Sequence, residues 1–155
     1  MTIKSSIPAV ITAVINACTS AVAGQVDNIS SSPVEVVDGE LGPRVPNQFV
    51  QILGVSNGQQ VWGSIGTQRR NETYTVHGMV RVYVGSDDQA YCRQRTADLF
   101  ALVETAVDSD PQLGAVVNGS IQASVTDVRW GVTDSGGRAA ELDFVLAVVT
   151  QLIAT

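Results

Sequence analysis

Hydrophobic and polar residues alternate over a long stretch near the middle of the chain. Between residues 73 and 84 the even positions are mainly aliphatic or aromatic, whereas the odd positions are mixed. Because successive side chains of a strand point to opposite faces, this pattern predicts a strand with one apolar face. At about 3.3 Å per residue it would span roughly 40 Å, which is longer than most strands of globular domains. We therefore expect part of it to project from the body or to pair with another subunit.

The first helical pattern lies near the N-terminus, over residues 7–23. Isoleucine, valine and cysteine side chains recur there at helical spacing and share one face. Ser5 or Ser6 can cap its start, Pro8 suits its first turn and Gly24 suits its end. The segment therefore predicts an amphipathic helix.

The same segment also imitates a secretory signal, with Lys4 before an apolar run and small residues up to Ala23. Thr12 and Asn16 interrupt the apolar run, which favours the helix. Cleavage after Ala23 would instead make the chain a secreted binding module, and this alternative stays open. No run approaches the ~20 apolar residues of a membrane span, so we expect no membrane partner.

A second helix is predicted over residues 87–108, directly after the long strand. Ser86 can cap it, the two aspartates that follow suit the positive end of its dipole, and Pro111 lies beyond its end. Its apolar face consists of Cys92, Thr96, Leu99, Val103 and Ala106.

The last third of the chain predicts a long hairpin over residues 120–153. Its first arm changes parity at Asp127, which a bulge there would reconcile, and its turn falls at residues 134–137. The second arm becomes apolar on both faces. This is expected of a strand that is central in its sheet or covered by a partner.

Shorter strands are predicted before the long one, over residues 34–37 and 47–55. Asn57-Gly58 is a strong signal for a tight turn between two strands, and residues 64–72 read as a polar loop.

These elements together predict one α+β domain spanning residues 1–155. Its sheet is mostly antiparallel, contains the long hairpin, and is packed on one face by the two α-helices.

Composition favours a protein that works with partners. Of 155 residues, 45% are hydrophobic and only 15% are charged, against about 25% charged in ordinary soluble domains. A surface poor in charge suggests coverage by partners, although a small, well-buried fold would have the same composition. The net charge of −6 and the absence of a basic run argue against gripping nucleic acid, since that affinity comes mainly from neutralising phosphates.

The chain lacks a recognisable set of catalytic or ligand-binding residues. His77 is the only histidine, so nucleophilic catalysis has one available imidazole base and a zinc site lacks its usual ligands. Cys18 and Cys92 fall on the apolar stripes of the two helices, where buried free thiols are expected, with a disulfide as the alternative if the helices are adjacent. We expect no enzymatic activity, no cofactor and no metal.

Polar residues around the long strand and the hairpin form the candidate subunit or partner interface. The arginine-bearing residues 68–72 are either a solvated turn or pair with an acidic neighbour, such as Glu141 or Asp143 of another copy. The full candidate interface is Arg69, Arg70, Glu72, His77, Arg81, Tyr83, Trp130, Arg138, Glu141 and Asp143.

The chain resembles the tail terminator proteins of long-tailed, siphophage-type bacteriophages from about residue 7 to residue 153. The resemblance rests on element order and on the N-terminal helix, the run RNETY at 70–74, Arg81 in the long strand, Leu99 and Val103 in the helix, DPQLG at 110–114, and a hairpin around Gly136-Gly137. Residues 25–46 are the least familiar part.

The resemblance implies a virion protein of the tail or neck, assembled in the cytoplasm of the host bacterium. It implies a ring, a hexamer in that family, that caps the tail tube, ends tube polymerisation and joins the tail to the head–tail connector protein. DNA would pass through the ring without specific binding. Another head–tail connector or head-completion protein, or a tail tube protein, is the alternative within the same class.

Overall fold

The computed structural model describes residues 3–29, 31–62, 69–83, 88–131 and 139–154. Two α-helices, α1 (Ile7–Ala21) and α2 (Gln89–Ser109), and a short 3₁₀ helix η1 (Leu113–Ala115) accompany one sheet. The strands of the described residues are β1 (Val34–Asp38), β2 (Gln48–Trp62), β3 (Arg69–Tyr83), β4 (Gly119–Gly131) and β5 (Ala139–Ile153), in the order β1-β2-β3-β5-β4. β1 pairs with β2 in parallel and the other pairs are antiparallel. The predicted α+β class with a mostly antiparallel sheet is confirmed.

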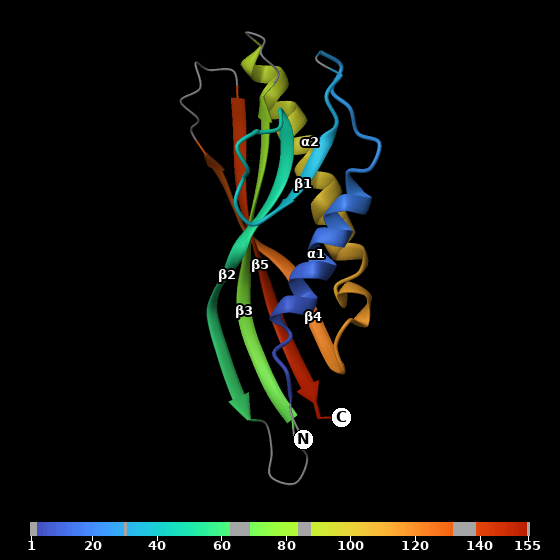
Figure 1. The fold of residues 1–155 in the computed structure, drawn as a ribbon, viewed down its shortest axis with the longest axis vertical. Helices are drawn as coiled ribbons and strands as arrows, with labels where there is room; N and C mark the ends of the chain where they lie inside the picture. Colours follow the sequence, from blue (N-terminus) through green and yellow to red (C-terminus); the bar gives the residue numbers. More distant parts are fainter. Residues whose placement is uncertain (1–2, 30, 63–68, 84–87, 132–138, 155) are drawn as a thin grey trace.

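Both helices lie on the same side of the sheet (Figure 1). Even-numbered residues of β3 and β5 point to this helix-covered face, where Val76 and Leu146 are fully buried. Val14 and Cys18 from α1 and Leu99 from α2 belong to the same core cluster. The alternation read from the sequence therefore identifies the buried face correctly. We call the opposite face, which carries the odd-numbered residues, the outer face.

The predicted helices differ from the observed ones at their ends. Ser6 occupies the N-cap position of α1, but its side chain makes no capping hydrogen bond there. α2 begins at Gln89 rather than at residue 87, and the Asp88 carboxylate caps it by accepting from Tyr91 N at 2.9 Å. Ser86 lies outside the described residues. The predicted free thiols are confirmed, since Cys18 and Cys92 are both buried and unbridged.

The predicted tight turn at Asn57-Gly58 is wrong, because β2 continues through it. Asn57 has a φ of 56°, and the pairing of β2 with β3 shifts register between Ser56 and Gln59. Asn and Gly tolerate left-handed backbone in a bulge as well as in a turn, so the dipeptide alone does not distinguish the two.

The long strand is longer than predicted at its start and makes a full ladder with β5. Arg69 to Glu72, expected in a loop, are strand residues, whereas residues 63–68 and 84 are outside the described part of the chain. In the hairpin, β4 and β5 pair with a register shift between Val125 and Asp127, which confirms the predicted bulge. The predicted turn at 134–137 lies outside the described residues.

Candidate assembly surface

Both edges of the sheet are partly open within the described part of the chain. β1 covers β2 only from Gln48 to Ile52, so residues 53–62 have a strand on one side only. β4 is the opposite edge strand. Among the strands it pairs only with β5, and on its other side Ala123 N donates to Pro111 O at 2.8 Å. An open edge presents unpaired N–H and C=O groups that can template the addition of another strand.

The open parts of the two edges lie at the same level of the sheet. The register defines rows that cross β2, β3, β5 and β4. One such row contains Gln59, Thr73, Val149 and Gln122. Another contains Gly54, His77, Val145 and Asp127. We call the rows of β2 residues 55–62 and β4 residues 119–125 the open half, and the rows of β2 residues 48–52 the covered half. The open half lies toward the bottom of Figure 1.

Neither edge carries a charge in the open half. Residues 53–62 and residues 119–126 contain no Asp, Glu, Lys or Arg, and charge on β4 begins at Asp127. Exposed apolar side chains occur on the β2 edge instead, including Val61 at 59% and Trp62 at 66% exposure. Soluble proteins usually protect open edges with charged residues. Uncharged edges with exposed apolar residues are therefore the ones expected to be covered on assembly.

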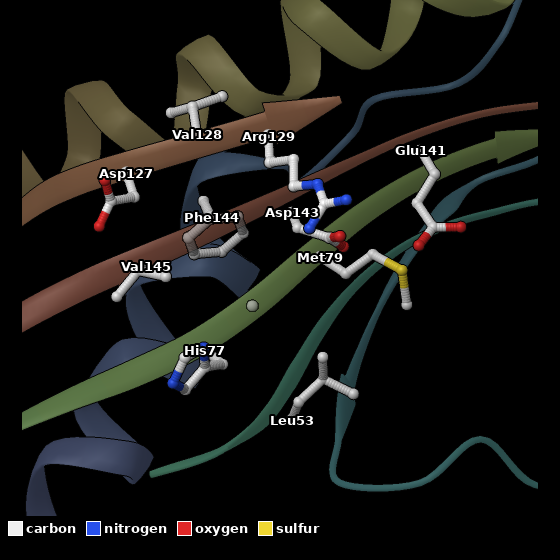
Figure 2. A pocket seen from close by; sticks show the side chains of 11 residues that line it. Leu53, His77, Met79, Asp127, Val128, Arg129, Glu141, Asp143, Phe144 and Val145 are labelled. Atoms are coloured by element: carbon white, nitrogen blue, oxygen red, sulfur yellow. The ribbon is translucent and has the colours of Figure 1, made fainter. Parts of the chain in front are cut away.

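The outer face carries a shallow hollow of about 690 Å³ at the boundary between the two halves (Figure 2). His77 and Met79 of β3, Asp143 and Val145 of β5 and Leu53 of β2 line part of it. Its walls are therefore partly apolar and partly charged, with Arg129 of β4 beside the carboxylates.

Two carboxylates of β5, Glu141 and Asp143, lie on this outer face. Burial raises the pKa of Glu141, the neighbouring Asp143 raises it further, and Arg81 on the paired strand lowers it. The carboxylate pair is therefore a site of like-charge repulsion, and Arg81 and Arg129 lie opposite the two carboxylates on the paired strands of the same subunit.

His77 is held in a cross-strand cluster of hydroxyl groups. Its Nε2 lies 2.6 Å from Ser56 Oγ and 3.3 Å from Thr75 Oγ1, and the two hydroxyls lie 2.9 Å from each other. A serine beside a histidine is one part of a nucleophilic site, but here Thr75 contacts the same nitrogen. The cluster explains His77 as a residue that ties β2 to β3.

Glu72 is the centre of a buried polar cluster that the sequence did not predict. It is 1% exposed, and its Oε1 lies 2.9 Å from Arg70 Nη2 and accepts from Gln60 Nε2 at 3.1 Å. Its Oε2 accepts from Ser6 N at 2.8 Å and from Ser6 Oγ at 2.5 Å. Ser6, expected to cap α1, thus joins the start of the helix to the sheet. The carboxylate also lies at the positive end of the helix dipole.

The predicted interface residues therefore separate into groups. Arg70 and Glu72 pair inside the subunit, and the Arg70 guanidinium lies 6.0 Å from the centre of the Trp62 ring. The outer face or the strand ends carry Arg69, His77, Arg81, Tyr83, Glu141 and Asp143. Trp130 is 47% exposed near the end of β4, and Arg138 lies outside the described residues.

Sequence reasoning missed the open edge of β2. The exposed Leu53, Val61 and Trp62 were assigned to a hairpin, and the absence of charge along residues 53–62 was the available signal. Across the described ranges, no group of three or more His, Cys, Asp or Glu side chains is arranged to hold a metal ion. Nor does the described chain contain a helix long and apolar enough to cross a membrane.

Comparison with solved structures gives a weak likeness to a chain of a virion particle. No family model matches the chain, and no curated protein sequence matches it. A chain of a solved structure described as "Virion of native gene transfer agent (GTA) particle" is similar with a TM-score of 0.45 and 8% sequence identity. The similarity covers 96% of this chain and 99% of that chain. At this level the likeness does not assign a role.

Proposed function

We propose that this protein is a structural subunit of a bacteriophage virion, a tail terminator that forms a closed ring. The observation that carries the proposal is the pair of uncharged, partly open edges at one level on opposite sides of the same sheet. Residues 119–125 of one subunit would pair with residues 55–62 of the next, and Pro111, whose carbonyl accepts from Ala123 N within the subunit, would move aside. The sequence resemblance to tail terminators supports the same role.

The strand directions are compatible with this contact. β4 is antiparallel to β5, which is antiparallel to β3, and β3 is antiparallel to β2. In a ring built by rotation alone, β4 of one subunit therefore meets β2 of the next in antiparallel orientation. Two different surface patches that meet repeatedly form a heterologous contact, and such contacts close into rings when the rotation allows it.

The remaining parts of the role follow from the resemblance to tail terminators. It would cap the tail tube, stop its polymerisation and join it to the head–tail connector protein, in the tail or neck of a virion assembled in the host cytoplasm. The acidic chain would let DNA pass without adhesion, since like charges repel. An ordered basic lumen in the assembled ring would count against this last point. We propose no enzymatic activity, no cofactor and no membrane partner.

Lysine substitutions on the two open edges test the contact. Gln59→Lys and Gln122→Lys each place a charge on an exposed edge residue, a change that blocks strand addition. Native mass spectrometry should show rings of the wild-type protein and loss of rings in both variants, with unchanged circular dichroism. Ser20→Lys, on the exposed face of α1, is the matched control and should keep the ring.

Electron microscopy with tail tubes distinguishes the terminator from its alternatives. A terminator forms a single ring at the end of a tube and stops its growth. Rings stacked along the tube would indicate a tail tube protein, and rings found only at the head a connector or head-completion protein. A chain that stays monomeric with tubes present would refute the ring. Cleavage after Ala23 in the mature protein would favour the secreted binding module.

A further inference from the structure

Residues 25–46 attach a short additional strand to one edge of the sheet. Within this segment β1 pairs in parallel with Gln48 to Ile52 and with no residue of the open half. The covered half therefore has five strands across the subunit, whereas the open half has four.

Buried polar contacts fix the start of this segment to the body of the protein. Asp27 is 2% exposed, and its carboxylate accepts from Ile29 N at 2.8 Å, Ser32 N at 3.0 Å and Gln48 Nε2 at 3.2 Å. Arg95 of α2 donates to the side-chain oxygen of the same Gln48 at 2.9 Å. A buried carboxylate with several donors is a strong anchor.

The other end of β1 is fastened as well. Gly39 N donates to Ile52 O at 2.9 Å, and Gln51 Nε2 donates to Gly39 O at 2.6 Å. Phe49, on the outer face of β2, is fully buried. β1 is therefore a fixed part of the sheet edge.

The free edge of β1 and the last residues of β4 lie at the same level, on opposite edges of the sheet. Through the register, Val36 is level with Trp130, and Val37 is level with Arg129. Trp130 is 47% exposed although it points to the helix-covered face. On the outer face, exposed Glu35 of β1 would lie diagonal to Arg129 of a neighbouring copy, within reach of a cross-strand ion pair.

Irregularities in both edge strands coincide with the level at which β1 ends. β1 ends at Asp38, opposite Ile52, and β2 has a register shift between Ile52 and Gly54. The bulge of β4 falls in the row of Gly54. A bulge bends its strand, so β4 changes direction at this level. It is the level at which β1 would be added to the sheet edge of the neighbouring copy.

We propose that β1 receives the last residues of β4 from a second copy of this chain, so that the ring wall has one more strand per subunit at one end. This inference rests on the proposed ring. The wall would widen by one strand spacing of about 4.8 Å per subunit, or about 9 Å in diameter for a ring of six. The ring would thus be a truncated cone, suited to joining partners of different width.

Two engineered cysteine pairs test the contact made by β1 separately from the contact that forms the ring. The pair Gln59→Cys/Gln122→Cys reports the open half, and Val37→Cys/Arg129→Cys reports the contact of β1. Within one subunit the first pair is three strand spacings apart, about 14 Å, so a disulfide can form only between copies. The native cysteines are buried and can stay.

Mild oxidation with oxidised glutathione should give ladders of linked subunits for both pairs. We expect yields at least about ten-fold above those of a mismatched pair, Ser20→Cys/Arg129→Cys. Ladders from the open-half pair without ladders from the Val37/Arg129 pair would overturn the role of β1 and leave the ring standing. Absence of ladders from both pairs would refute the ring contact.

Charge exchange provides a second test that needs no cysteine. Glu35→Arg and Arg129→Glu should each reduce the fraction of rings in native mass spectrometry, and the double variant should restore it. Glu35→Arg keeps an exposed side chain on an edge strand, whereas Arg129→Glu places a carboxylate opposite Asp143 of β5, so circular dichroism and thermal unfolding of each variant must first show a folded subunit. A double variant no better than the single ones would contradict the pairing of these residues.

Discussion

The cluster around Glu72 yields the sharpest test of the structure. Glu72→Gln keeps the size of the side chain but removes its charge. Both carboxylate oxygens accept hydrogen bonds, from Ser6 on one side and from Gln60 and Arg70 on the other. An amide has one acceptor atom, so its NH₂ group would face donors on one of these sides. The Arg70 side chain is only 12% exposed and would lose its ion-pair partner.

The expected loss of stability follows from these contacts. Removing one member of a buried ion pair costs about 3–5 kcal/mol, and the loss of negative charge at the start of α1 adds up to about 1 kcal/mol. The amide can keep part of the hydrogen bonding, so we take the lower value of about 3 kcal/mol. For a domain of this size that corresponds to a decrease in Tm of about 6–12 °C.

Urea and thermal unfolding followed by circular dichroism measure this loss. Both should be done in the Gln122→Lys background, so that assembly does not contribute. Glu40→Gln, at an exposed position, is the matched control and should stay within about 0.5 kcal/mol of the parent. Adding Arg70→Met to Glu72→Gln should recover part of the stability, because the unpaired guanidinium is gone. A Glu72→Gln variant as stable as the control would refute the reasoning.

Two further predictions concern the sheet. A Cβ at Gly78 would overlap the ring of Phe144, so Gly78→Ala should destabilise the fold by about 1–3 kcal/mol in urea unfolding, whereas Gly58→Ala, with open space around it, should not. Stability equal in both variants would show that the ring of Phe144 moves aside without cost. Glu141 has its pKa raised by burial and by a neighbouring aspartate, so the folded state holds its proton more tightly than the unfolded state does. The stability that this tighter proton binding adds is present below the ordinary pKa of 4.5, and it is lost as pH rises through the higher pKa of the folded state. Glu141→Gln should therefore reduce the fall in stability over that range, as measured by Tm against pH; an unchanged profile would contradict this.

Local patterns in the sequence determined the elements and their faces. The alternation of the long strand identifies the buried positions because side-chain direction in a strand depends only on residue parity. The parity change at Asp127 predicts a bulge for the same reason, and the structure has one. Helical spacing places Cys18 and Cys92 in the core, where both are buried.

Only the tertiary structure decided which strands are neighbours and which edges stay open. Whether a residue is at an odd or an even position does not identify the strand that pairs with its own, because the hydrogen bonds between strands join backbones that are distant in sequence. The parallel pairing of β1 with the first part of β2 is such a contact, and so is the alignment of Gln59 with Gln122 across the sheet. Glu72 shows the same limit. The sequence placed it in a polar loop, because the partner that makes burial of its charge tolerable is a helix start that lies 66 residues away in sequence.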